Sequence, residues 1–177
     1  MTDIEASARR EVRLRLDQDF HVFEGYSGIH KHGGERVEYD IVLRAKPHLV
    51  EAGFDEGFAI VEVKLFNLDD KKKHDVKARD LLWQSVAYSF SDICLPDGTT
   101  QRPLFVLYFL SGTGVDPKHT AEFQTLHHFV QRGGVGRLEL SQKRGWSMIF
   151  GGSNYFREFA GKGPHHVGTK RQTGSSR

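Results

Sequence analysis

Apolar residues gather or alternate in a set of short segments, as expected for β-strands. In chain order these segments are Phe20–Glu24, Arg36–Arg44, Phe58–Phe66, Pro103–Leu110 and a hairpin made of Leu138–Leu140 and Trp146–Phe150. Pro103–Leu110 is apolar throughout, which is typical of a strand covered on both faces. The four glycines between Gly25 and Gly34 indicate a turn or loop, and a second loop is expected from Lys46 to Gly57.

Three other segments carry apolar residues at helical spacing. The first is Asp3 to Leu16, where an apolar residue recurs every four positions. The second begins at Asp69 or Asp70 and runs to about Ser91, and we expect its buried stripe to consist of Val76, Trp83, Ala87 and Phe90. The third begins at Asp116-Pro117, an N-cap with proline at the first helical position, and ends at Gly133-Gly134.

The order of these elements predicts a mixed α/β (α+β) architecture with a central mixed sheet flanked by helices. Its core is a helix, three strands, a helix and a strand, followed by a C-terminal helix and hairpin. With 177 residues, the chain suits one domain, expected over residues 1–160. From Gly161 to Arg177 the chain is rich in Gly, His, Ser and basic residues and has no acid, which predicts a flexible tail.

Composition narrows the class of protein. No run of 18 apolar residues occurs, so no membrane span or membrane partner is expected. The acidic start of the chain lacks an apolar segment, so no signal peptide is expected. A single cysteine, Cys94, fits a reducing compartment and predicts a cytoplasmic protein. The net charge of +2 does not by itself identify a nucleic-acid partner.

Charged residues interrupt two of the predicted strands. Glu62 and Lys64 project from the same face of one strand, about 7 Å apart along it, and Asp40 interrupts the preceding strand. Charges at such positions cost free energy unless they are paired or bound to a metal. If the strands are neighbours, Asp40 and Glu62 can bind one Mg²⁺, with the backbone carbonyl of Val63 as a further ligand. Lys64 would then orient a water or neutralise phosphate charge. The alternative is a salt bridge between Glu62 and Lys64 or Arg44 on a solvated sheet face.

The predicted second helix carries a polar and aromatic stripe beside its apolar one. Gln84 and Tyr88 are four residues apart and share a helix face. This face can line a phosphodiester site, or it can be a half-exposed polar margin.

Asp40, then Glu62-Val63-Lys64 on the next strand, then a helix with Gln84 and Tyr88, resembles the PD-(D/E)XK nuclease superfamily. The pair of Gln84 and Tyr88 resembles the RecB-like branch, and the resemblance covers about residues 5 to 111. It implies a restriction-endonuclease-like core and Mg²⁺- or Mn²⁺-dependent hydrolysis of DNA.

The same resemblance assigns a role to each of these residues. Asp40 and Glu62 would be metal ligands and Lys64 the catalytic lysine, with Gln84 and Tyr88 as supporting residues. Glu11 on the first helix corresponds to the additional acid of Holliday-junction resolvases, and Glu5 is an alternative. Tyr39 stands where the signature has proline.

Basic residues predict contacts with the phosphates of DNA. One cluster lies at the start of the Gln84 helix and another lies at the hairpin tip: Lys71, Lys72, Lys73, Lys77, Arg79, Lys143 and Arg144. The alternative for the first cluster is a solvated helix start. The histidine pairs lack zinc spacing, and no nucleophile elbow occurs.

The leading hypothesis is therefore a Mg²⁺-dependent deoxyribonuclease. A second hypothesis is a catalytically inactive nuclease-like fold that binds nucleic acid or serves in an assembly. A third keeps the fold and takes RNA as the substrate. Many sequence-specific members of the superfamily are dimers, but no dimerisation stripe is evident in this sequence.

Overall fold

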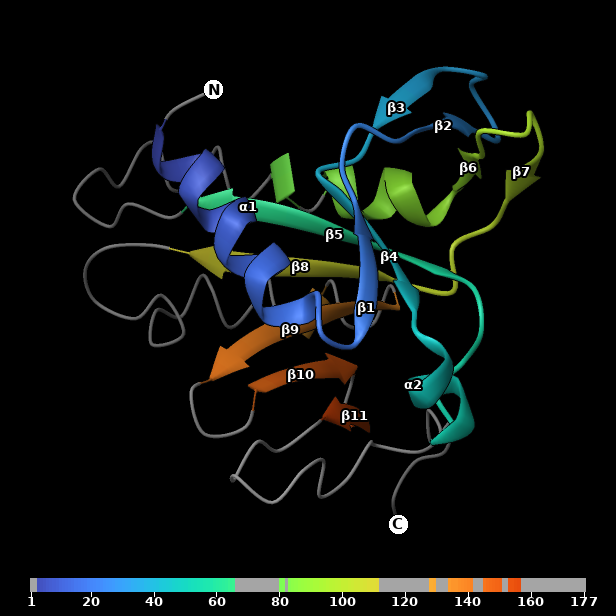
Figure 1. Cartoon of the computed structure of the whole chain (residues 1–177). Coiled ribbons are helices and arrows are strands. Elements are labelled where there is room, and N and C mark those ends of the chain that lie inside the picture. The colour runs from blue at the N-terminus through green and yellow to red at the C-terminus, as the bar shows by residue number, and fades with distance from the viewer. Residues whose placement is uncertain are drawn as a thin grey trace, which may run out of the picture.

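A seven-stranded mixed sheet forms the centre of the computed structural model (Figure 1), which describes residues 3–65, 80–81, 83–111, 128–129, 134–141, 145–150 and 153–156. In spatial order its strands are β1 (Phe20–Phe23), β4 (Ile41–Ala45), β5 (Phe58–Leu65), β8 (Val106–Ser111), β9 (Val135–Ser141), β10 (Gly145–Phe150) and β11 (Ser153–Phe156). The pairs β5–β8 and β8–β9 are parallel, and the other pairs are antiparallel. The expected mixed α/β architecture with a central mixed sheet is thus observed.

Helix α1 (Asp3–Leu16) covers one face of this sheet (Figure 1). Its residues Ala8, Val12 and Leu16 recur every four positions, as predicted, and all three are buried. They share one core cluster with residues of β4, β5 and β8 and with Trp146 of β10. Because β10 is four strands away from β4 yet belongs to this cluster, the sheet must curl around α1.

Strand β5 separates two apolar cores. Val61 and Val63 point into the α1 cluster, whereas Ile60 points into a second cluster on the opposite face. Glu62 and Lys64 have the same parity as Ile60, so their side chains project on the opposite face, as the period-two pattern predicted. That face is covered by the helix that includes residues 83–89.

A second, four-stranded sheet lies beside the first, at the top right of Figure 1. Its order is β3 (Arg36–Glu38), β2 (Ser27–His30), β6 (Ser91–Cys94) and β7 (Thr100–Gln101). The expectation of a loop from Gly25 to Gly34 was therefore wrong, because β2 pairs on both sides. Gly28 allows this packing, since a Cβ there would lie 1.9 Å from the Tyr39 hydroxyl oxygen.

The prediction of one continuous strand from Arg36 to Arg44 was wrong. The segment is divided into β3 in the second sheet and β4 in the first, with a bend at Asp40. Tyr39 packs with Val42 in one core cluster, whereas Ile41 packs in the other. Strict alternation would have placed Tyr39 and Ile41 on one face, so the bend reverses the face between them.

The predicted orientation of the second helix was also wrong. Trp83 and Phe90, expected in its buried stripe, are 67% and 43% exposed. Leu81, Ser85 and Tyr88 are buried instead, and they also follow helical spacing. Both stripes satisfy the period, and Tyr88 finds hydrogen-bonding and aromatic partners on the inner side, which favours the orientation observed.

The remaining predictions divide into three groups. The hairpin is confirmed as β9 and β10, and β8 is buried from Val106 to Phe109 as expected. The loop expected after Lys46 contains a short helix, α2 (Pro47–Glu51). The predicted helix after Asp116, apart from residues 128–129, and the predicted tail lie outside the described residues.

No helix in the described part of the chain is long and apolar enough to cross a membrane.

Candidate active site

The register of β4 and β5 brings the two predicted acids together. These strands are antiparallel, and Ile41 lies opposite Val61. Asp40 and Glu62 each lie one position beyond this pair, so they occupy facing positions at the end of the β4–β5 ladder. The sequence-based condition that Asp40 and Glu62 come from neighbouring strands is therefore met.

The Asp40 side chain forms a hydrogen bond to β5 beyond the last backbone pair of β4 and β5. Its Oδ2 accepts a hydrogen bond from the backbone N–H of Val63 at 2.9 Å, which places the carboxylate beside the backbone of β5. Its Oδ1 lies 3.3 Å from Nη2 of Arg9 on α1. Because the backbone bends at Asp40, the carboxylate takes the place of a main-chain acceptor for Val63. The Asp40 side chain is 18% exposed, so solvent and ligands still reach it.

Glu62 is buried, and only one of its two carboxylate oxygens has a partner in the described part of the chain. Its Oε1 lies 2.7 Å from Nζ of Lys64, on the same strand face. Its Oε2 is buried and has no hydrogen-bond partner among the described residues. Burial raises the pKa of Glu62 to about 7, the nearby charge of Asp40 adds to this effect, and Lys64 opposes it.

Tyr88 reaches the same place from the covering helix. Its hydroxyl donates a hydrogen bond to the backbone carbonyl of Glu38 at 2.7 Å. Its one proton is thus engaged at Glu38, and the hydroxyl lowers the pKa of the neighbouring Glu62 carboxylate without satisfying its Oε2. Burial raises the pKa of Tyr88 itself, and the charges of Glu62 and Asp40 raise it further. Tyr88 therefore stays protonated at neutral pH and keeps its hydrogen bond to Glu38.

Gln84 lies one helical turn before Tyr88 on the same helix face. After β5 the chain passes through this helix and then through β6 and β7 before it enters β8, and Figure 1 shows the helix lying along β5 and running opposite to it. Gln84 consequently lies toward the Lys64 end of the strand. Its Oε1 is buried and has no hydrogen-bond partner among the described residues.

Two residues that sequence reasoning did not single out support this site. Tyr39 directly precedes Asp40, and its hydroxyl is hydrogen-bonded to Oγ of Ser91 at 2.7 Å. Its ring packs edge-on against Tyr88, with 5.1 Å between the ring centroids. Tyr39 and Ser91 are both buried, so together they fix the bend at Asp40 against the second sheet and the covering helix.

Comparison with known proteins finds no match for this chain. No protein family, curated protein or solved structure matches it. The chemistry of the site is therefore inferred from its own residues.

The described residues contain no group of three His, Cys, Asp or Glu side chains that could hold a metal ion. Among these side chains Glu11 is thus not grouped with Asp40 and Glu62, and its role as an additional acid stays a prediction. Glu11 is exposed and lies about 160° around α1 from Arg9, the helix residue that contacts Asp40. Glu5, one turn before Arg9, lies on the nearer side of the helix.

The donors that are present still fit a hard divalent cation. Mg²⁺ needs few protein oxygens because it retains several waters. Asp40 and Glu62 supply two carboxylates, and the open Oε2 of Glu62 is an acceptor that no described donor satisfies. The basic residues predicted to contact DNA, from Lys71 to Arg79 and at 143–144, lie outside the described residues.

A second buried acid provides a comparison. The Asp19 side chain is fully buried, and its Oδ2 accepts a hydrogen bond from Nε1 of Trp146 at 2.8 Å. Its Oδ1 lies 2.9 Å from Nε2 of His48 on α2. Both oxygens therefore have protein partners that join separate elements, which is a structural arrangement. Glu62 differs because one of its oxygens has none.

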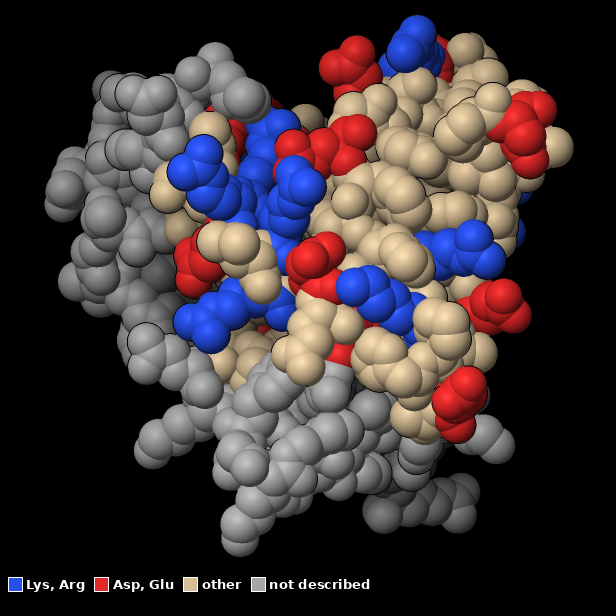
Figure 2. All heavy atoms as spheres, in the orientation of Figure 1, with Lys and Arg blue, Asp and Glu red and all other residues tan. Residues whose placement is uncertain are grey.

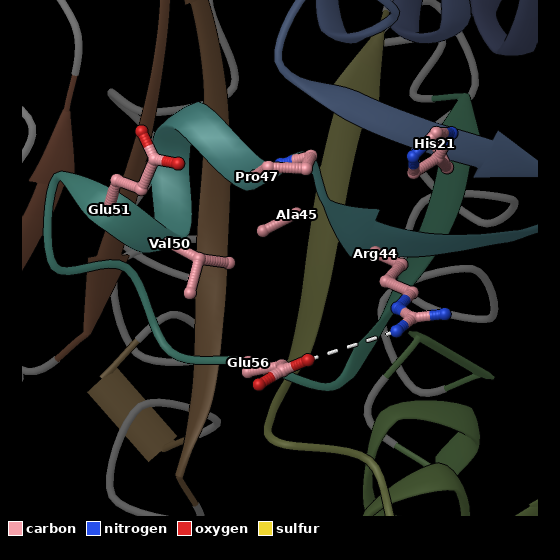
Figure 3. Close-up of a pocket in the computed structure, with 7 residues that line it drawn as sticks. All are labelled: His21, Arg44, Ala45, Pro47, Val50, Glu51 and Glu56. Carbon is pink, nitrogen blue, oxygen red and sulfur yellow. Dashed lines mark ion pairs between the residues drawn. The ribbon is translucent and has the colours of Figure 1, made fainter.

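A surface hollow of about 400 Å³ lies at the other end of β4 (Figure 3). Its lining includes His21, Glu51, Arg44 and Glu56. Nη2 of Arg44 lies 3.8 Å from Oε1 of Glu56. Arg44 is four residues along β4 from Asp40, a separation of about 13 Å. This hollow is therefore separate from the candidate site.

Proposed function

We propose that this protein is a metal-dependent nuclease that hydrolyses DNA phosphodiester bonds, with the restriction-endonuclease-like core of the PD-(D/E)XK superfamily. One observation carries the proposal. Asp40 and Glu62 meet from neighbouring strands, one oxygen of Glu62 is buried without a partner, and Lys64 stands at its flank. The order of α1, three strands of the main sheet, the covering helix and β8 supports the same assignment.

Asp40 and Glu62 would hold Mg²⁺ or Mn²⁺, and the backbone carbonyl of Val63 is the candidate third protein ligand. When bound, such an ion supplies Lewis-acid polarisation of a phosphate oxygen and lowers the pKa of water. The two carboxylates are held in place from both sides, because Val63 N–H and Arg9 hold Asp40 and Lys64 holds Glu62. Such preorganisation reduces the reorganisation that the site must undergo when substrate binds.

Lys64 is the residue that acts on the phosphate. Its side chain is 17% exposed, so the ammonium group can reach both the Glu62 carboxylate and a ligand at the site. There it would neutralise charge that develops on the phosphate or orient the attacking water. Tyr88 would position the Glu62 carboxylate, and Gln84 would offer its open amide oxygen toward Lys64.

The proposal is tested by incubating the protein with plasmid, linear duplex and single-stranded DNA, and with RNA. Cleavage should require Mg²⁺ or Mn²⁺ and should stop in EDTA. Lys64→Ala and Asp40→Asn should each reduce cleavage by about 100-fold or more. Lys31→Ala is the matched control, because Lys31 also pairs with a carboxylate, Asp92, at 3.1 Å, but in the second sheet. Cleavage by the Lys64 and Asp40 variants at the wild-type rate would refute the proposal.

The ion pair of Asp40 with Arg9 favours a second candidate function. Both oxygens of Asp40 already have protein partners, as in a purely structural carboxylate. In that case the protein binds nucleic acid, or serves in an assembly, without cleaving nucleic acid. DNA binding in a gel-shift assay, with no cleavage in Mg²⁺ or Mn²⁺, would establish this function in place of the nuclease.

A further inference from the structure

One side of α1 carries a row of arginines. An α-helix turns about 100° per residue, so Arg9, Arg13 and Arg10 fall within about 100° of one another. Arg15 is also exposed, but it lies about 120° or more around the helix from each of them. We call Arg9, Arg10 and Arg13 the α1 arginine row.

Two ion pairs show where this row lies. Arg9 contacts Asp40 at 3.3 Å, and Nη1 of Arg13 lies 3.7 Å from Oε1 of Glu24. Glu24 directly follows β1, whose Phe23 pairs with Val42 of β4. Both contacts therefore place the row above the ends of β1 and β4 that adjoin the candidate site. Figure 2 shows basic side chains gathered over α1 on this face of the molecule, with acidic groups between them.

Exposure along the row increases away from the site. The Arg9 side chain is 24% exposed and that of Arg13 is 60% exposed, and Arg10 is exposed. The Arg13–Glu24 pair is open to solvent on both sides, so exchanging its carboxylate for another anion costs little. Guanidinium groups bind phosphate oxygens in pairs of parallel hydrogen bonds, which suits this row to a polyanion.

We infer that the α1 arginine row binds the phosphodiester backbone of the nucleic acid and directs it toward Asp40 and Glu62. This inference rests on the proposed function for the position of the scissile bond. Arg9 is the inner contact, next to the carboxylates, and Arg10 and Arg13 are the outer contacts. Glu24 competes with the nucleic acid for Arg13.

The test measures binding of a fluorescent DNA duplex in EDTA, by anisotropy, over a range of salt concentrations. Arg10→Gln and Arg13→Gln should each weaken binding by about five- to tenfold at 0.1 M salt, and each should reduce the salt slope by about 0.9. Arg15→Gln, which removes the same charge from the other side of α1, should have a clearly smaller effect. Glu24→Gln should tighten binding by about twofold, because it releases Arg13.

Equal effects of the Arg10, Arg13 and Arg15 substitutions would overturn the inference, and so would weaker binding by Glu24→Gln. All four side chains are exposed, so the variants should fold, and circular dichroism checks this. A cleavage assay in Mg²⁺ distinguishes failure of the α1 arginine row from failure of the proposed nuclease function. If the protein cleaves DNA but these variants match Arg15→Gln in binding, the arginine row is refuted and the nuclease stands. If no form cleaves DNA but binding falls as expected, the nuclease is refuted and the row stands.

Discussion

Glu62→Gln offers the most direct test of the electrostatics at the site. In the unfolded chain Glu62 ionises near pH 4.5, whereas in the folded protein without metal its pKa is about 7. The folded state therefore binds this proton more tightly than the unfolded state. The stability that the proton provides is fully present below pH 4.5 and is lost as the pH rises through 7. Glutamine resembles the protonated side chain and does not ionise.

The magnitude follows from the two pKa values. They differ by about 2.5, and one pKa unit corresponds to about 1.4 kcal/mol, so ionised Glu62 costs the folded state about 3 kcal/mol. Glu62 is 1% exposed, so solvent screening reduces this figure little. We expect the variant and the wild type to have similar free energies of unfolding near pH 4.5. Near pH 8 the variant should be more stable by about 3 kcal/mol.

Urea unfolding in EDTA, followed by tryptophan fluorescence at several pH values between 4.5 and 8, measures this difference. Glu51→Gln is the matched control, because Glu51 is exposed on α2 and should leave the difference near zero at every pH. Parallel pH profiles for the wild type and Glu62→Gln would refute the reasoning. They would mean that Glu62 is already ionised at no cost in the folded state.

Two further substitutions probe the surroundings of the site and the curl of the sheet. Tyr88→Phe removes a hydroxyl that donates to a β3 carbonyl at 2.7 Å and lowers the pKa of Glu62. We expect it to lower the free energy of unfolding by about 1 kcal/mol and to move the Glu62 titration, followed by NMR of labelled glutamate, to higher pH. Gly136→Ala places a Cβ 2.4 Å from the Phe150 ring, so urea unfolding should show a loss of about 1–3 kcal/mol. Gly33→Ala meets nothing closer than 3.5 Å and should change little; equal losses for both glycines would contradict the packing argument.

Local pattern was sufficient for β1, β5, β8 and the hairpin of β9 and β10, and for the charged positions within β5. Side chains alternate along a strand, so Glu62 and Lys64 had to share the face opposite Val61 and Val63, and the structure confirms this. The recurrence of Ala8, Val12 and Leu16 likewise identified the buried side of α1. These features depend only on spacing along the chain, which the sequence states directly.

The sequence by itself therefore identified the three residues of the candidate site: Asp40, Glu62 and Lys64. Tertiary structure decided which residues surround them. Two stripes of the covering helix fit the helical period equally well, and only packing against the sheet buried Tyr88 and exposed Trp83. The contact of Arg9 with Asp40 joins positions that are 31 residues apart, and it exists because α1 packs against β5 and β1, which are the neighbours of β4 in the sheet. Periodicity reports the direction of a side chain relative to its own element, whereas the partner that it meets depends on how separate elements pack.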